Sequence, residues 1–287
     1  MKLFRYDADR IPVLWFTLLF GLDLLVFFLV DSLAFVGAWM VIGMFPKACI
    51  SSFGHHHQHL PTFHQPILNR CLEIVLGFQT GATSHAWFLH HVVGHHQHYK
   101  DQALDESRWQ REDGRTMGAH EYSAVLFGTS YARAFTAGRR FPRLRLAFIA
   151  MALLQVALLS WLFVLNWVNA LLLFLLPMAV SLYITCWHTY YHHAGLDTDD
   201  DLRASFNIEH RWYNILTGNL GYHTAHHMAG GLHWSLLPRL HGEICGRIPP
   251  ECFREPSIPF TWMPGAQEVH RTERPTRISV SEKQERS

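Results

Sequence analysis

The chain has 287 residues, of which 49% are hydrophobic and 16% are charged. This composition excludes a disordered protein, a collagen and a small disulfide-rich domain. Lys and Arg number 24 and Asp and Glu number 23, so the formal charge of +1 lacks the basic excess of a nucleic-acid-binding protein, and we expect no nucleic-acid partner. The 22 histidines are the unusual feature, because they are concentrated in a few short runs.

Four apolar stretches are long enough to cross a bilayer as helices. They comprise residues 11–30, 33–50, 146–165 and 167–187. The links within each pair are very short and carry no Lys or Arg, whereas basic residues precede the first and third stretches. By the positive-inside rule, both termini and the long middle segment are cytoplasmic. We therefore predict an all-α multi-pass membrane protein with four transmembrane helices in two hairpins; four buried helices of a soluble protein are the alternative.

The polar segments between and after the hairpins are predicted to form a helical cytoplasmic cap. Residues 66–78 are apolar but interrupted by three polar residues, so we expect an interfacial helix that lies on the bilayer. From Pro256 onward the chain is rich in proline and charge and cannot bury enough apolar surface to fold. We therefore divide the chain into a membrane domain over residues 1–255 and a disordered cytoplasmic tail over residues 256–287.

Four histidine runs lie just past apolar segments, on the predicted cytoplasmic side. Each contains two histidines spaced i, i+4, which share a helix face with Cβ atoms about 6 Å apart, a spacing that suits metal chelation. These pairs are His55 and His59, His91 and His95, His188 and His192, and His223 and His227. His96, His193 and His226 add neighbouring imidazoles. Because three or four ligands fill a mononuclear zinc site, this set of histidines predicts a dinuclear metal centre.

The ligand type leaves the element open, since imidazole suits Zn, Cu, Fe and Ni alike. The zinc-protease motif H-E-x-x-H and the soluble di-iron signature Glu-x-x-His are both missing from the sequence. Neutral imidazoles leave the charge of a metal uncompensated, so nearby acidic residues are expected to support the ligands from outside; a solvated acidic loop is the alternative. The candidates are Asp101, Asp105, Glu106, Asp197, Asp199, Asp200 and Asp201.

With these histidines, the chain resembles the membrane fatty-acid desaturase superfamily over roughly residues 40–240. The most specific stretch is YNILTGNLGYHTAHH, residues 213–227, which is similar to the last histidine box of the sphingolipid-type desaturases. In that superfamily the boxes bind two irons that activate dioxygen and remove hydrogen from an unactivated C–H bond. The resemblance implies that the metal ligands are His55, His59, His91, His95, His96, His193, His223, His226 and His227. His192, His188 and His98 remain alternative ligands.

Two departures from the family pattern concern the metal site. The middle box reads HxxxHH, which resembles the hydroxylase branch more than the common acyl desaturases. Thr189 stands where many desaturases have an Asn that holds a water molecule. One of the two irons is therefore expected to have a different ligand set.

The resemblance implies an oxygen-dependent di-iron oxidoreductase, with dioxygen as co-substrate, that acts on the aliphatic chain of a lipid or fatty acid. Desaturation is the favoured reaction; alkyl or acyl hydroxylation, decarboxylation to a terminal alkene and a non-redox metal-binding membrane protein are the alternatives. The chain has no nucleotide-binding, haem or iron–sulfur motif, so we expect an external electron donor of ferredoxin, rubredoxin or cytochrome type with its reductase.

Further residues are candidates for the surroundings of the substrate. Trp15, Phe27, Phe35 and Trp87 are candidates to line an acyl tunnel, although such residues are usually lipid-facing or core. Asp23 lies near the middle of the first stretch, where an acid is costly, so it is a functional candidate; a buried Asp bonded to a neighbouring helix is the alternative. His233 and His241 either border the substrate entrance or belong to a packed amphipathic segment.

Overall fold

The computed structural model describes residues 2–264. This part of the chain is helical and contains isolated β-bridges but no β-strand, which confirms the all-α prediction. The α-helices are α1 (Arg10–Leu29), α2 (Leu33–His59), α3 (Pro66–Thr80), α4 (Ala119–Ala137), α5 (Pro142–Leu165), α6 (Trp167–Ala170), α7 (Leu176–His193), α8 (Arg211–Thr217), α9 (His223–Met228) and α10 (Leu237–Ile244). Two π-helices are η2 (Phe88–Val93) and η4 (Leu171–Leu175). The 3-10 helices are η1 (Asp7–Asp9), η3 (Gly138–Arg140), η5 (Trp234–Leu236), η6 (Cys245–Arg247), η7 (Pro250–Cys252) and η8 (Phe260–Trp262).

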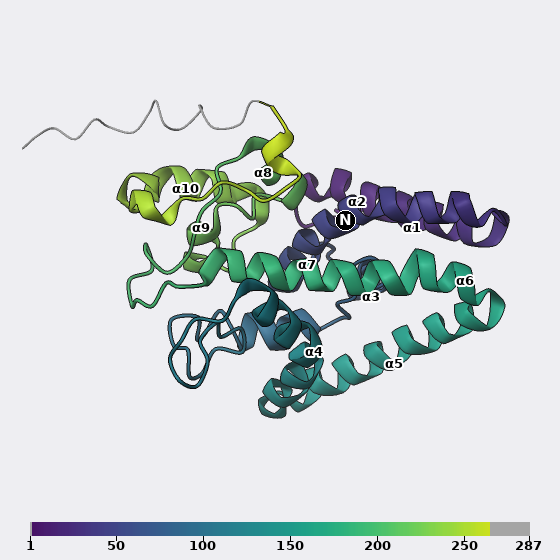
Figure 1. The fold of residues 1–287 in the computed structure, drawn as a ribbon, viewed down its shortest axis with the longest axis horizontal. Coiled ribbons are helices and arrows are strands. Elements are labelled where there is room, and N and C mark those ends of the chain that lie inside the picture. Colours follow the sequence, from purple (N-terminus) through teal and green to yellow (C-terminus); the bar gives the residue numbers. More distant parts are fainter. Residues whose placement is uncertain (1, 265–287) are drawn as a thin grey trace, which may run out of the picture.

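Four helical segments are long and apolar enough to cross a membrane. They are Asp7–Leu29, Leu33–His59, Pro142–Leu165 and Trp167–His193. Each coincides with one of the predicted apolar stretches. Figure 1 shows these segments extending together toward one end of the molecule, while α8, α9 and α10 gather at the other end.

The outer faces of these four segments are apolar and uncovered. Ile11 is 80% exposed and Val164 is 83% exposed, and many other large aliphatic side chains on α1, α2 and α5 are exposed as well. A soluble protein rarely presents contiguous apolar surface of this kind, whereas lipid solvates it without cost. The chain is therefore a membrane protein, with a core between the helices that is built around Phe27, Phe78 and Phe174.

A buried ion pair lies inside this apolar bundle. Lys47 of α2 and Asp23 of α1 are 2.9 Å apart, and both side chains are shielded from solvent. Lys47 also donates to the carbonyl oxygen of Leu173 in the π-helix η4, and Asp23 accepts a hydrogen bond from the indole of Trp39. Asp23 is thus a buried acid bonded to a neighbouring helix, the second of the two interpretations of this residue.

Helix α3 forms where the interfacial helix was expected, but its polar residues have interior partners. α3 packs against α1, α2 and α7. The side chain of Asn69 bonds the backbone of Phe63 in both directions, at 2.8 and 3.0 Å. Glu73 is buried and accepts hydrogen bonds from His57, Arg70 and Ser84. The polar residues that interrupt the apolar pattern of this segment therefore make contacts inside the fold.

The end of the described chain differs from the expected tail. Phe260 is buried and packs against Tyr213 of α8, with 5.1 Å between the ring centroids. Residues 256–264 thus pack against the fold, because the side chain of Phe260 is buried against Tyr213. The rest of the predicted tail, residues 265–287, lies outside the described residues.

Candidate metal centre

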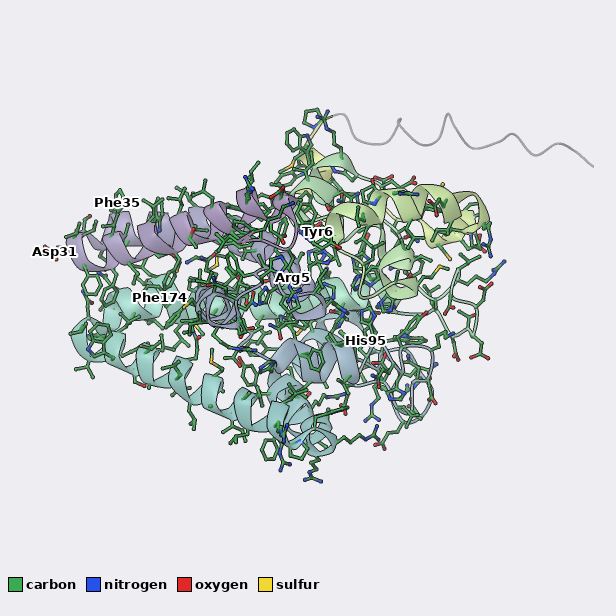
Figure 2. All side chains as sticks on the ribbon, turned by 180° about the vertical axis from the view of Figure 1, so that it is seen from behind. Arg5, Tyr6, Asp31, Phe35, His95 and Phe174 are labelled. Atoms are coloured by element: carbon green, nitrogen blue, oxygen red, sulfur yellow. The ribbon has the colours of Figure 1, made fainter. Side chains whose placement is uncertain are left out.

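Two clusters of imidazole rings lie side by side at the C-terminal ends of α2 and α7. The first cluster consists of His55, His59, His91, His96 and His226, whose ligand nitrogens all lie within 4.8 Å of one another. The second cluster consists of His95, His193, His223 and His227. His95, labelled in Figure 2, is fully buried. The rings of His96 and His227 stack at 4.1 Å, so the two clusters are in direct contact.

The last turns of α2 supply two members of the first cluster. α2 continues past its apolar run to His59, so His55 and His59 lie one turn apart on one face of the same helix. Their Nε2 atoms are 3.1 Å apart. The i, i+4 spacing thus brings the two nitrogens together as the sequence predicted.

The middle run is divided between the clusters in a way that its spacing did not predict. His91 pairs with His96, at 3.1 Å between Nε2 atoms, whereas His95 belongs to the second cluster. The predicted pairing of His91 with His95 on one helix face is therefore wrong. The π-helix η2 ends at Val93, and in the turn that follows it the carbonyl of His91 accepts from the backbone N–H groups of His95, at 3.1 Å, and of His96, at 2.8 Å. The bond to His96 is a π-type turn, which brings residues five apart to the same face.

The last run also serves both clusters, from the short helix α9. His223 and His227, spaced i, i+4, have Nε2 atoms 3.2 Å apart in the second cluster. His226 points to the first cluster, where its Nε2 lies 3.0 Å from that of His96. Consecutive residues of a helix point about 100° apart, so His226 and His227 reach different clusters.

The loop before α9 is fixed by close backbone packing. A Cβ added to Gly221 would lie 2.1 Å from the carbonyl oxygen of Ile208, so only glycine fits there. The side chain of Asn214 accepts a hydrogen bond from the N–H of Gly221 and donates to Ile208. Asn207 in turn accepts from the N–H of Thr224 in α9. Residues 213–227, which carry the resemblance to the desaturases, thus supply the histidines of α9 and also contacts that fix the loop before them.

On α7, His193 belongs to the second cluster and His192 does not. The Nδ1–H of His192 donates to the carbonyl of Phe206 at 2.9 Å, and its Nε2 lies 3.1 Å from the hydroxyl of Tyr213, from which it accepts. Both nitrogens of His192 are therefore occupied. The Nε2 of His193 lies 2.9 Å from that of His223 and 3.3 Å from that of His95, which favours His193 over the alternative ligand.

The hydrogen bonds on the outside of the second cluster indicate what its centre holds. The Nδ1–H groups of His95, His193 and His223 donate to Asp105, to the carbonyl of Ala204 and to the carbonyl of Leu220. These partners only accept, so Nδ1 carries the proton and Nε2 of each neutral ring has a bare lone pair. The Nε2 lone pair of His193 thus meets those of His95 and His223 at 3.3 and 2.9 Å, and such lone pairs repel unless a cation lies between them.

The distances between the ring nitrogens fit a metal ion. A metal–nitrogen bond of about 2.1 Å separates neighbouring ligand nitrogens by roughly 3.0 Å in octahedral and 3.4 Å in tetrahedral geometry. The shortest Nε2 separations run from 3.0 to 3.1 Å in the first cluster and from 2.9 to 3.3 Å in the second. The residues present therefore fit two metal ions held by imidazoles.

Burial keeps the cluster histidines that lie outside the four long apolar helices in the form that binds metals. Desolvation, with a further contribution from neighbouring imidazoles, lowers the pKa of five of these rings well below the usual value. They are His91, His96, His223, His226 and His227. A neutral ring offers a lone pair, whereas a protonated ring does not, so these rings are ready to bind a cation at neutral pH.

The remaining predicted histidines lie outside both clusters. His98 and His188 are in neither cluster, and His57 contacts Glu73 and Thr62. His233 contacts Asp9 at 3.2 Å and His241 contacts Glu209 at 3.0 Å. His233 and His241 are therefore buried residues of a packed segment and not residues that border a substrate entrance.

The candidate acidic residues divide in the same way. Asp105 is buried and bonds a cluster histidine. Asp201 accepts from Tyr99 and Lys100 near the surface, and Asp197 accepts weakly from Gln110 at 3.4 Å. Of the acidic residues predicted to support the ligands, Asp105 is the one that does so in the described part of the chain.

Tyr99 is a residue near the second cluster that the histidine pattern did not indicate. Its ring lies 4.3 Å from that of His227, and its hydroxyl donates to Asp201 at 2.7 Å. Tyr99 therefore closes the second cluster on its outer side. The available signal was its position four residues after His95, which places the two on one side of a helical turn.

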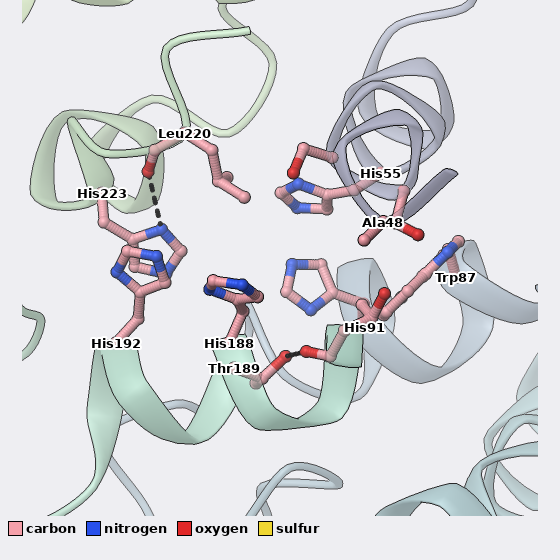
Figure 3. A pocket seen from close by; sticks show the side chains of 12 residues that line it. Ala48, His55, Trp87, His91, His188, Thr189, His192, Leu220 and His223 are labelled. Carbon is pink, nitrogen blue, oxygen red and sulfur yellow. Dashed lines mark hydrogen bonds between the residues drawn. The ribbon is translucent and has the colours of Figure 1, made fainter. Parts of the chain in front are cut away.

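A cavity reaches both clusters from the membrane side. It is lined by Ala48, Ser51, Ser52, His55, Trp87, His91, Thr185, His188, Thr189, His192, Leu220 and His223 (Figure 3). Of the four residues proposed for an acyl tunnel, Trp87 borders this cavity. Phe35 is 51% exposed on α2, Phe27 lies in the bundle core and Trp15 packs against Phe53. The hydroxyl of Thr189 donates to the carbonyl of Thr185.

Comparison with protein families gives one match that covers most of the chain. The model of the family described as "Fatty acid desaturase" matches residues 31–255. No curated protein and no solved structure matches the chain. The matched range begins just before α2 and contains all nine histidines of the two clusters.

Proposed function

Because the chain belongs to the fatty acid desaturase family, we propose that it is an oxygen-dependent di-iron enzyme that desaturates the aliphatic chain of a lipid or fatty acid. Family membership makes it an oxidoreductase of lipid chains with a histidine-rich metal site. The observation that supports two metals is the division of nine imidazoles into two adjoining clusters, each at ligand spacing.

We assign the nine cluster histidines as the metal ligands. Five of them would hold one iron, and His95, His193, His223 and His227 would hold the other. A bound pair of irons supplies activation of dioxygen and abstraction of hydrogen from an unactivated C–H bond. The protein holds the rings in one orientation through Asp105 and the carbonyls of Ala204 and Leu220, and it keeps water from the clusters by burying them.

The substrate is placed by the cavity on the membrane side of the clusters. His55 and His91 of the first cluster and His223 of the second form part of its wall, so an aliphatic chain in this cavity lies against both clusters. Trp87, Ala48 and Leu220 supply apolar wall. We propose that these side chains hold a methylene group at the metal centre and exclude bulk solvent.

The membrane topology is part of the proposal. The short links between α1 and α2 and between α5 and α6 favour two hairpins whose tips lie on the far side of the membrane. The basic residues before α1 and in Arg139–Arg145 favour cytoplasmic termini and a cytoplasmic cap. The metal centre would then lie at the cytoplasmic surface of the bilayer. An external donor of ferredoxin, rubredoxin or cytochrome type, with its reductase, would deliver electrons to that face.

Three measurements test the proposal. Metal analysis of the purified full-length chain should give about two irons per chain, and oxygen uptake should require a lipid chain and an electron donor. Mass spectrometry of the lipids of an expressing host should show a product two hydrogens lighter than its precursor. The double variant His223→Ala, His227→Ala should abolish it, while His120→Ala, an exposed histidine far from both clusters in sequence, should not.

The same spectra separate the related reactions. A product one oxygen heavier would indicate hydroxylation, and an alkene one carbon shorter would indicate decarboxylation. Zinc alone in protein from iron-replete cells, with host lipids identical for the intact chain and the double variant, would contradict the oxidoreductase function.

A further inference from the structure

The second cluster has an oxidisable side chain packed against its outer side. The centroid of the Tyr99 ring lies 4.3 Å from that of His227 and 6.1 Å from those of His95 and His193. These separations are typical of aromatic rings that pack together in a protein interior. Tyr99 therefore adjoins three of the four imidazoles of this cluster, and an electron can pass between them without crossing solvent.

The hydroxyl of Tyr99 leads from the cluster to the surface. It donates to Oδ1 of Asp201 at 2.7 Å. Lys100 donates to the same oxygen at 2.8 Å and to the backbone carbonyl of Asp199 at 3.2 Å, which fixes the position of the carboxylate. The side chain of Asp201 is 49% exposed. Tyr99 thus connects a buried imidazole cluster with a carboxylate that is in contact with water.

This connection combines the two groups that oxidation of a tyrosine requires. A phenol is among the most easily oxidised side chains, and the loss of one electron turns its hydroxyl into a strong acid. The oxidation is therefore favourable only where a base accepts the proton. Asp201 is ionised at neutral pH and already accepts the hydrogen bond of this hydroxyl. Because the carboxylate is exposed, water solvates it before and after the proton arrives.

The other oxidisable rings near the clusters lack such an acceptor. Trp87 lies 5.7 Å from His91, but its indole N–H is buried and has no hydrogen-bond partner within residues 2–264. Tyr213 donates to His192, whose ring is buried, and a positive charge on a buried imidazole is costly. Tyr99 is thus the ring of the described chain that combines contact with a cluster and a base near water.

We propose that Tyr99 is a redox-active residue that gives one electron to the metal centre when dioxygen has oxidised this centre and no C–H bond is within reach. The electron leaves the phenol ring, the O–H bond of Tyr99 breaks and the proton joins the carboxylate of Asp201. A neutral tyrosyl radical remains, and the metal centre is reduced by one electron. The external donor then returns an electron and Asp201 returns the proton, which restores Tyr99.

The inference rests on the proposed function and adds protection of the metal ligands to it. An oxidant that meets no substrate attacks the side chains around it, and in both clusters these are imidazoles. An imidazole that has gained oxygen is lost as a ligand, whereas a tyrosyl radical near the surface can be reduced again. Transfer of the oxidising equivalent to Tyr99 therefore preserves the site.

Electron paramagnetic resonance tests the proposal directly. The purified, iron-loaded, full-length chain is reduced, mixed with dioxygen without lipid or donor, and frozen. We expect a tyrosyl radical signal that narrows when the protein is made with ring-deuterated tyrosine. Tyr99→Phe keeps the ring contact but has no hydroxyl, so it should abolish the signal at equal iron content. Tyr213→Phe is the matched control and should keep it.

The proton acceptor and the protective effect have their own measurements. Asp201→Asn replaces the carboxylate with an amide, a far weaker base, and should lower the radical yield several-fold. Asp199→Asn, at an exposed acid of the same loop, should leave the yield unchanged. Peptide mass spectrometry after repeated exposure to dioxygen without lipid should show more oxygen added to the cluster histidines in Tyr99→Phe than in the original chain.

Two results would overturn the inference. One is a tyrosyl signal that survives in Tyr99→Phe. The other is the absence of any tyrosyl signal from the original chain, with equal oxidation of the cluster histidines in that chain and in Tyr99→Phe. Either result, in a chain that binds iron and consumes oxygen with a lipid, leaves the proposed function intact. A chain that binds no iron and consumes no oxygen would contradict the proposed function and this inference together.

Discussion

Asp105 accepts a hydrogen bond from Nδ1 of His95, with the two carboxylate oxygens 2.9 and 3.0 Å from the ring nitrogen. Both side chains are almost fully buried. The same carboxylate accepts from the backbone N–H of Ser107 at 2.7 Å, which anchors the loop that carries it. The contact therefore fixes which nitrogen of His95 faces the second cluster and increases the basicity of that nitrogen.

Replacing this carboxylate should weaken metal binding without removing a ligand. In Asp105→Asn, the amide oxygen can still accept from His95, but the negative charge is gone. We expect iron affinity at the second cluster to fall by about 10- to 100-fold, the usual effect of losing a partner of a ligand histidine. Iron retained during a chelator titration measures this. Asp197→Asn, at an exposed acidic residue, is the matched control, and equal retention in the two variants would contradict the role of Asp105.

Neighbouring histidines should affect different metals. His226 belongs to the first cluster and His227 to the second, although they are adjacent in α9. We expect His226→Ala and His227→Ala each to lower the iron content from about two toward one per chain, and the double variant to retain almost none. Metal analysis by mass spectrometry checks the stoichiometry. Loss of both irons in each single variant at unchanged thermal stability would indicate one shared site.

The ring of Tyr99 should hold His227 in place. The Nδ1 of His227 has no hydrogen-bond partner within residues 2–264, and the ring is held between those of Tyr99 and His96. Tyr99→Phe keeps the ring contact and should retain iron at the second cluster, whereas Tyr99→Ala should lose it several-fold faster. Rates of iron release to a chelator compare the two. Equal release from both variants would show that the ring contact does not matter.

The metal-free protein should lose stability in mild acid. Burial lowers the pKa of His91, His96, His223, His226 and His227 well below 6.5 in the fold, while the unfolded chain titrates near 6.5. The unfolded state therefore binds more protons as pH falls below about 6.5, which favours unfolding. The stability these neutral rings provide is fully present above that pH. Melting temperatures of the metal-free chain at pH 8, 6.5 and 5 should be level at first and then fall; a rise between pH 6.5 and 5 would contradict this.

The ion pair inside the bundle should be strongly coupled. Lys47→Met leaves the carboxylate of Asp23 buried without its cationic partner, which should cost about 3–5 kcal/mol of stability. The double variant Asp23→Leu, Lys47→Met removes both charges and should recover most of that loss. Thermal unfolding in detergent compares the single and double variants. Additive losses in the double variant would show that the two residues do not stabilise each other.

The sequence by itself determined the four long helices of this protein and two of its histidine pairs. Runs of about 20 apolar residues set the four long helices, because a single segment can satisfy all of its own backbone hydrogen bonds in lipid only as a helix. The i, i+4 spacing correctly paired His55 with His59 and His223 with His227, since a regular helix places such residues on one face. The regular geometry of a helix was sufficient to predict these features.

Only the tertiary structure decided how the histidines are shared between the clusters. The turn after the π-helix η2 brought His96, and not His95, to His91. Hydrogen bonds from distant segments occupied both ring nitrogens of His192, whereas the Nε2 of His193 was left facing the second cluster. His188 faces a cavity between α2, α7 and the C-terminal segment, a space that exists only once these elements pack. Spacing along the chain specifies which face of a regular helix a ring occupies, whereas irregular backbone and long-range packing specify what that ring meets.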